Sequence, residues 1–442
     1  MQHVRRNTAL VALAAALTLA ACTSPTSSKP STTGTGSGSG STPTSVANNS
    51  TVGITADAVK ISMIAADLSI LSKQHLAPDI GDPVKVGEAV VADINAHGGV
   101  GNGRKLVLTT HVIPNAPIAT AAVLQQACVQ ATEEDKPLAV VITAAVIDPV
   151  VQCVSVAHNQ IAMTMDSWTQ KMYADSGGRI FSLATPMSID VEREYSYWPT
   201  LLDVTHALTG KTLGIIAQDQ PSNQAAALKA LEASLKKRGD KVAAEATVPY
   251  PEGAETCTQP DVAIERMQQA KVDFVFLVAQ NLCSAALVKA AQDANFKPQW
   301  ATIGNNVTDT VAQFMAPAKA DYDGAWGVGT VFDTNKTDAD CNAIAAGAGL
   351  HYAVGSDAYS FAGVTCTQIE TLAAALRSAK APLTQGTVIN ALQSMSSVPM
   401  VGGPAGSLSP IKHDAGDYVF IEKYSAAAGK FLPYDKTPRR VP

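Results

Sequence analysis

Strand-like and helix-like segments alternate along most of the chain, and this alternation restricts the possible folds more than any other feature of the sequence. The run LAVVIT at 138–143 is continuously apolar, which is typical of a strand buried on both faces. An alanine-rich helical segment, 116–132, precedes this run, and a second helical segment, 149–158, follows it. Because parallel strands need crossover connections, such alternation indicates parallel sheets with helices on both faces. We therefore predict an α/β fold.

The strand-and-helix rhythm restarts near residue 211, which indicates a second α/β unit. Two helical segments, 358–378 and 385–395, then appear without strands of their own, and a β-rich segment follows at 417–424. Helices without strands need an existing sheet to cover. We therefore expect the chain to return to the first unit before it ends on the second.

A glycine cluster at 98–103 has the composition of a nucleotide-binding loop, but the helix and the strand that flank it come in the wrong order. Such a loop follows a strand and opens a helix. Here helix spacing (Val86, Val90, Ile94) precedes the glycines and a β-rich stretch follows them, so we interpret them as a helix end and a turn. The sequence GKT at 210–212 lacks the earlier glycine of a phosphate-binding loop, since residue 205 is threonine. We expect no cofactor.

The first 21 residues have the features of an export signal, with Arg5 and Arg6 before an apolar core that ends at Ala21. Small residues before Cys22 resemble the lipobox of bacterial lipoproteins, which implies a signal peptide at 1–21 and a lipid on Cys22. An ordinary secretory signal with an incidental cysteine is the alternative. Residues 22–51 are mostly Ser, Thr, Gly, Pro and Asn, and we interpret them as a flexible tether. We expect an extracytoplasmic protein anchored to the cell membrane.

The charge balance argues against a nucleic-acid partner. The formal net charge is −6, and it becomes −8 without residues 1–21, which contain two arginines and no acidic residue. We find no basic stripe, so we expect no nucleic-acid binding.

Six cysteines remain if Cys22 carries a lipid, and an even number in an exported chain indicates disulfides. Fifteen pairings are possible. The spacings favour pairs of sequence neighbours, since each such pair spans about one helix and one strand: Cys128–Cys153, Cys257–Cys283 and Cys341–Cys366. The chain has no CxxC pair and its histidines are scattered, so we predict no metal site.

The order of segments over about residues 52–436 resembles the type I periplasmic solute-binding proteins, the branched-chain amino acid and amide binders of ABC importers. The stretches that carry the resemblance are INAHGGVGNGRKLVL, KTLGIIAQDQPSNQAAALKALEASLKKRGDKV, VDFVFLVAQNLCSAALVKAAQDANF, SFAGVTCTQIETLAAALRSA, APLTQGTVINALQSM and GPAGSLSPIKHDAGDYVFIEKY.

This resemblance implies two Rossmann-like lobes with parallel sheets, joined by a three-crossover hinge, with a ligand held in the cleft between them. It also implies a monomer that closes on its ligand and docks on the permease of an importer. The expected boundaries are 52–186 and 332–398 for lobe 1, and 187–331 and 399–437 for lobe 2.

Ligands of open α/β sheets bind beyond the carboxyl ends of strands, so the loops after strands are the expected site. The predicted ligand-binding residues are Asp67, Ser69, Ala144, Ala145, Asp166, Ser167, Trp168, Asp219, Gln220, Gln280, Asn281 and Asn305. Asp and Asn also build turns and cap helices, and Trp168 also suits a packing role. The loop at 143–146 has fewer hydroxyl groups than its counterparts in amino acid binders. The solute is therefore an amino acid, an amide, a small organic acid or a more apolar compound.

An enzyme and a sensor are the competing functions. The folded region has no GxSxG and no HExxH motif, and we interpret Glu192 and Glu194, beside Arg193, as a solvated helix face. We therefore expect no catalysis. A lipoprotein of the same fold that signals to a membrane partner is the alternative to transport.

Overall fold

The computed structural model describes most of the chain after residue 48. The described ranges are 49–73, 77–114, 116, 119–143, 148–185, 188–219, 222–250, 257–303, 318–329 and 335–442. Cys22 and nearly all of the predicted tether lie outside these ranges, as do Ala144, Ala145, Gln220 and Asn305 from the predicted site. In the described part, no helix is both long enough and apolar enough to cross a membrane.

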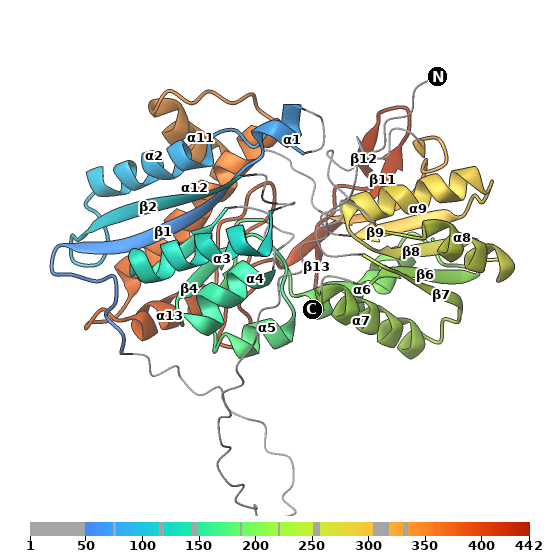
Figure 1. Ribbon diagram of the computed structural model, residues 1–442, viewed down its shortest axis with the longest axis horizontal. Coiled ribbons are helices and arrows are strands. Elements are labelled where there is room, and N and C mark those ends of the chain that lie inside the picture. The colour runs from blue at the N-terminus through green and yellow to red at the C-terminus, as the bar shows by residue number, and fades with distance from the viewer. Residues whose placement is uncertain are drawn as a thin grey trace, which may run out of the picture. The chain divides into compact units, whose positions relative to one another are not determined.

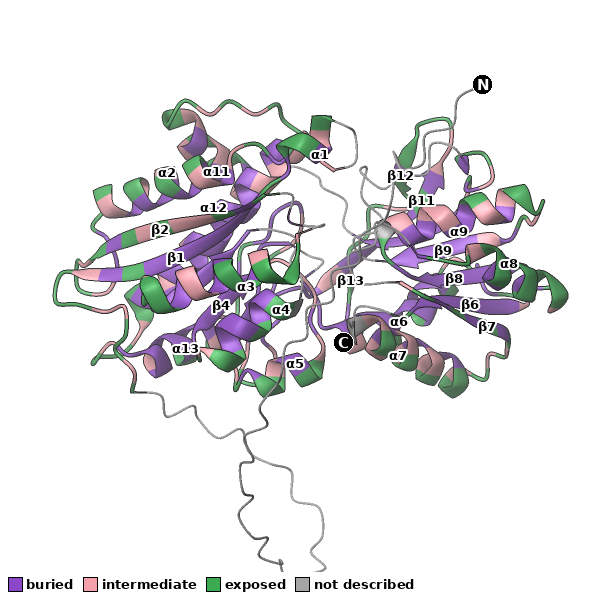
Figure 2. Cartoon of the chain, in the orientation of Figure 1, coloured by how far each residue is buried: buried purple, intermediate pink, exposed green. Residues whose placement is uncertain are grey.

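The first sheet consists of five parallel strands in the order β2-β1-β3-β4-β5. Their bounds are β1 Ala58–Asp67, β2 Lys105–Pro114, β3 Ala139–Ile142, β4 Ile161–Thr164 and β5 Ile180–Ser182. Every residue of β3, β4 and β5 is buried, and Figure 2 shows β4 in the colour of buried residues. The apolar run at 138–143 therefore has the cover on both faces that its composition predicts.

Helices cover both faces of this sheet, because successive side chains of a strand point to opposite faces. Along β1, Ile61 and Met63 pack in one core with α2, while Ile64 and Ala66 pack in another with α3. The helices from this part of the chain are α1 Ser69–Lys73, α2 Pro83–Ala96, α3 Ala121–Val129, α4 Asp148–Gln152 and α5 Gln170–Asp175. Short π-helical segments continue α3 to Glu134 and α4 to Ala157.

The second sheet has the order β12-β11-β10-β9-β8-β6-β7, and β13 pairs with β11. Its strands are β6 Leu213–Gln218, β7 Val242–Val248, β8 Phe274–Val278, β9 Gln299–Ile303, β10 Trp326–Gly329, β11 Tyr418–Ser425, β12 Lys430–Pro433 and β13 Arg439–Arg440. Its helices are α6 Val191–Asp203, α7 Ser222–Arg238, α8 Pro260–Gln269 and α9 Asn281–Asp293.

This second sheet is parallel from β7 to β10 but not throughout. β11 runs antiparallel to β10, β12 and β13. A short turn suffices to join antiparallel strands, and β11 and β12 are joined in this way at residues 426–429. The prediction of parallel sheets therefore holds for the alternating part of the chain and not for its last strands.

The late helices pack on the first sheet, far from their sequence neighbours. They are α11 Lys336–Gly347, α12 Asp357–Ser378 and α13 Gln385–Gln393. Ile369 and Leu372 of α12 and Ile389 of α13 are fully buried in the same core as β1 and α2. Figure 1 shows α11 and α12 beside α2 and β1. α11 was not predicted from the sequence, because its apolar residues are mostly alanine.

The segment between α13 and β11 also belongs to the first core, which differs from the predicted lobe boundary at residue 399. Met400 and Leu408 are buried with β1 and α2. Met400 forms a parallel bridge with Ala184, and Asp414 forms one with Ser182 of β5. The chain therefore reaches the second sheet only at β11. Because these residues bridge to the sheet singly and form no continuous strand, their sequence has no periodicity that reveals where they pack.

Three disulfides join the predicted pairs of cysteines, Cys128–Cys153, Cys257–Cys283 and Cys341–Cys366. The first joins α3 to the π-helical segment after α4, and the third joins α11 to α12. The second joins the residues before α8 to the first turn of α9.

Candidate functional site

The carboxyl ends of β1, β3 and β4 lie along one edge of the first sheet, because these strands are parallel neighbours. Asp67 ends β1, and its carboxylate accepts a hydrogen bond from the backbone N–H of Ser69 (2.9 Å). This backbone hydrogen bond lowers the pKa of Asp67. Asp67 therefore fixes the turn into α1 and presents a charged group at the edge.

The end of β4 is held by Thr164, whose hydroxyl oxygen accepts two hydrogen bonds. They come from the backbone N–H of Asp166 (3.0 Å) and from the indole N–H of Trp168 (3.3 Å). The Trp168 ring is 2% exposed and packs with Leu68. Trp168 is thus part of the core on the α3 side of the first sheet, whereas Asp166 and Ser167 are half-buried at the edge.

The edge of the second sheet brings Asp219 and Gln280 together with Gln218 and Tyr250, which were not among the predicted ligand-binding residues. The Asp219 carboxylate accepts a hydrogen bond from the backbone N–H of Tyr250 (2.7 Å). The side-chain oxygen of Gln218 accepts one from the backbone N–H of Gln280 (2.6 Å). Asp219 and Gln218 therefore connect the end of β6 to the segments that follow β7 and β8.

Gln280 and Tyr250 offer side chains at this edge. Gln280 is exposed and directly precedes α9, and among the described residues its side chain makes no capping hydrogen bond to that helix. Tyr250 is half-buried, and burial raises the pKa of its hydroxyl. Its position just after β7 is the sequence signal that could have identified it. Asn281 opens α9 beside the positive end of the helix dipole.

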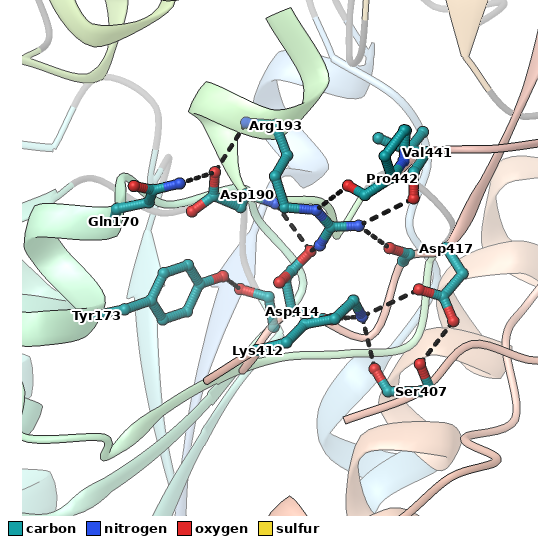
Figure 3. Close-up of polar contacts among 12 residues, drawn as sticks. Gln170, Tyr173, Asp190, Arg193, Ser407, Lys412, Asp414, Asp417, Val441 and Pro442 are labelled. Carbon is teal, nitrogen blue, oxygen red and sulfur yellow. Dashed lines mark hydrogen bonds and ion pairs between the residues drawn. The ribbon is translucent and has the colours of Figure 1, made fainter. Parts of the chain in front are cut away.

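A network of charged residues lies where the chain crosses between the two sheets (Figure 3). Arg193, in the first turn of α6, pairs with the carboxylate of Asp414, which also accepts a hydrogen bond from the backbone N–H of Asp190 (3.0 Å). The Arg193 guanidinium also donates to the backbone oxygens of Pro442 (3.0 Å) and Val441 (3.5 Å). One side chain of α6 therefore joins this helix to two other segments of the chain.

A second cation, Lys412, completes this network. Its ammonium group lies 3.2 Å from the carboxylate of Asp417 and donates to the backbone oxygens of Ser407 (2.6 Å) and Asp414. The Ser407 hydroxyl donates to the other carboxylate oxygen of Asp417 (2.7 Å). The turn at 407–417 is therefore held by charge-assisted hydrogen bonds.

Burial changes the acid strength of several groups at this junction. It raises the pKa of Asp190 to about 7 and that of Glu194 to about 8. It also lowers the pKa of His413 to about 4, so this histidine is neutral at pH 7. Glu194 is 4% exposed, which shows that the interpretation of this helix turn as a solvated face is wrong. Glu194 lies in the first turn of α6, close enough to Asp190 and Asp414 for their charges to raise its pKa further.

One group of possible metal ligands, Cys128, Cys153 and His158, lies close together in the described residues. Both sulfur atoms belong to a disulfide, so they offer no thiolate to a metal ion.

Comparison with known proteins identifies the family. The profile of the family described as periplasmic binding protein matches residues 77–423, and the chain belongs to this family. Among solved structures, a type 1 periplasmic binding protein from Bordetella pertussis Tohama I is 18% identical (TM-score 0.61) and aligns over 87% of this chain and 100% of its own. The fold is thus that of the type I periplasmic binding proteins. No curated protein matches the chain.

Two further similar structures contain ligands. An ABC transporter substrate-binding protein from Desulfitobacterium hafniense, in complex with Leu, is 14% identical (TM-score 0.59; 85% of this chain and 100% of that chain). A solute-binding protein of an ABC transporter from Rhodopseudomonas palustris HaA2, in complex with p-hydroxybenzoic acid, is 13% identical (TM-score 0.63; 87% and 98%).

We predict that Arg193→Met destabilises the protein strongly. Removing the guanidinium takes away the cation that forms an ion pair with the Asp414 carboxylate, whose side chain is 3% exposed, and breaking a buried ion pair costs about 3–5 kcal/mol. Urea unfolding of Arg193→Met, Asp414→Asn and the double variant would measure the coupling. Lys336→Met is the control, because Lys336 and Asp340 form an exposed pair whose loss costs about 0.5 kcal/mol. Equal effects of the two single cation variants would contradict a structural role for Arg193.

We also predict that Glu194→Gln flattens the pH dependence of stability. The folded chain keeps the Glu194 proton up to about pH 8, whereas the unfolded chain loses it near its ordinary pKa of 4.5. The unfolded state therefore binds fewer protons in this window, and the free energy of unfolding falls as pH rises. Between pH 5 and pH 8, the melting temperature of the variant should fall less than that of the unmodified chain. Glu88→Gln, on the exposed face of α2, is the control, and an identical pH profile for both variants would refute the assignment.

Proposed function

We propose that the chain is the solute-binding component of an ABC importer and that it captures a small carboxylate-bearing solute, an amino acid or an organic acid, between its lobes. The membership of residues 77–423 in the periplasmic binding protein family carries this proposal. Ligands of such α/β sheets bind at the carboxyl edges of the strands, where Asp166, Ser167 and Gln280 lie.

The polar groups at the two edges support a carboxylate in the solute. The Asp67 and Asp219 carboxylates accept hydrogen bonds from backbone N–H groups, Asp67 within the turn into α1 and Asp219 from the segment after β7. The N-terminus of α9 carries the positive end of a helix dipole, which favours an anion. Leucine and p-hydroxybenzoic acid, which occupy two of the similar structures, both contain a carboxylate. An amide would use the same hydrogen-bonding groups but gain less from the dipole.

The first experiment is a screen by thermal unfolding of the refolded chain against amino acids, aromatic and aliphatic acids, amides and sugars. A ligand at 100 times its dissociation constant adds about 2.7 kcal/mol to the free energy of unfolding. We expect stabilisation by a carboxylate compound and weaker stabilisation by its primary amide. Gln280→Ala should weaken binding, whereas Gln292→Ala, at the other end of α9, should not. A folded protein that no compound stabilises would contradict solute binding.

We further propose that Cys22 carries a lipid that keeps the binder beside its permease, with residues 22–51 as the tether. Tethering raises the effective concentration of the binder at the permease. In cells, Cys22→Ser should move the protein from the membrane fraction to the soluble fraction, and mass spectrometry should find a diacylglycerol-modified cysteine only in the unmodified chain. Cys22 with a free thiol at the membrane would contradict this proposal.

A further inference from the structure

Two hydrogen bonds join the strand ends at the carboxyl edge of the second sheet. The Asp219 carboxylate binds the backbone N–H of Tyr250 and so connects the end of β6 to the segment after β7. The side-chain oxygen of Gln218 binds the backbone N–H of Gln280 and so connects the end of β6 to the end of β8. Gln218 is 2% exposed, so its hydrogen bond is shielded from water.

The disulfide Cys257–Cys283 adds the third connection at this edge. It joins the segment that follows β7 to the first turn of α9, which follows β8. The next residue, Ser284, donates from its backbone N–H to the oxygen of Gln280 (2.8 Å) and from its hydroxyl to the oxygen of Ala279 (3.3 Å). The disulfide thus fixes the first turn of α9, and this turn binds the backbone of Gln280 through Ser284. The three connections link the ends of β6, β7 and β8 in a closed triangle.

The disulfide Cys341–Cys366 is a natural comparison. It closes a segment of nearly the same length, with a sequence separation of 25 against 26, and its cysteines are also buried. The chain-entropy model therefore gives the two disulfides about the same effect on stability. Cys341–Cys366 joins two helices, α11 and α12, and no strand end.

We infer that the Cys257–Cys283 disulfide is a positioning element for solute binding, because it fixes Gln280 and the start of α9 at the carboxyl edge of the second sheet. This inference rests on the proposed function. A binding group that is already held in place loses less conformational freedom when the ligand arrives. The disulfide therefore contributes to affinity as well as to stability.

The test compares Cys257→Ala/Cys283→Ala with Cys341→Ala/Cys366→Ala in the exported chain. Binding of L-leucine and of p-hydroxybenzoic acid would be measured by calorimetry, stability by thermal unfolding, and local opening by amide hydrogen exchange without ligand. We expect both variants to lose similar stability. We expect affinity to fall about tenfold in the first variant and less than about twofold in the second. The Gln280 amide should exchange faster only in the first variant.

Equal affinities and equal Gln280 exchange rates in the two folded variants would overturn the inference. If Cys257→Ala/Cys283→Ala does not fold, Gln218→Met opens the same triangle by removing the acceptor of the Gln280 N–H, and Gln218→Glu restores an acceptor. Faster exchange and weaker binding in Gln218→Met, with recovery in Gln218→Glu, would support positioning, and no change in Gln218→Met would overturn it. If neither compound binds the unmodified chain, the choice of solute fails separately, and the exchange rate of Gln280 still decides whether the disulfide holds this edge.

Discussion

The need to cover both faces of a parallel sheet determines the path of this chain. The part of the chain that forms β1 to β5 also forms α2, which covers one face of the first sheet, and α3 and α4, which cover the other. The remaining apolar surface on the α2 face is covered by α11, α12 and α13, which come more than 150 residues after β5. The chain must therefore leave the first sheet, build the second, return and leave again. The hinge of this fold is a consequence of the way its first core is completed.

The crossings in turn require a polar junction. Backbone that crosses between sheets cannot satisfy all its N–H and C=O groups within a strand or a helix, so side chains must complete the hydrogen bonding. Arg193 meets this need because a guanidinium has five N–H donors in a fixed plane, and it binds both a carboxylate and several backbone oxygens. A lysine at this position has three donors on one nitrogen and could not reach the same groups in one geometry. The buried carboxylates Asp190 and Glu194, with their raised pKa values, are a consequence of packing this junction tightly.

The sequence allowed the prediction of the regular elements, because burial leaves a direct record in composition. The apolar run at 138–143, the restart near residue 211 and the helices without strands each follow from one requirement, the exclusion of water from a sheet. The regular cysteine spacings allowed the disulfides to be paired in the same way. α11 escaped prediction because alanine packs against either core or solvent, so its pattern has little contrast.

The roles of polar residues were harder to predict, because the role of each one depends on a partner that can lie far away in the sequence. Asp67 ends a strand and Asp219 follows one, as ligand residues do, yet both carboxylates accept backbone hydrogen bonds that shape the edge. Glu194 and Arg193 have the composition of an exposed helix turn, and only a partner 221 residues away from Arg193 makes that turn buried. Local patterns carry no information about such a partner.

If the chain binds a solute between its lobes as proposed, the junction and the edge have separate roles in that binding. Rigid groups at the edge of the second sheet reduce the ordering that a solute must impose, so more of its interaction energy remains for moving the lobes. A ligand shifts the equilibrium between open and closed forms only by its differential affinity for the two. When the binding groups of the second sheet are already held in place, they contact the ligand equally in both forms. The difference in affinity between the forms then depends mainly on contacts from the opposite lobe. Arg193 would take part in any such movement, since it joins α6 to the turn that contains Asp414 and to the segment after β13. In the proposed function, the ion pair at the junction and the disulfide at the edge would therefore act together, one on the movement of the lobes and the other on the position of the binding groups.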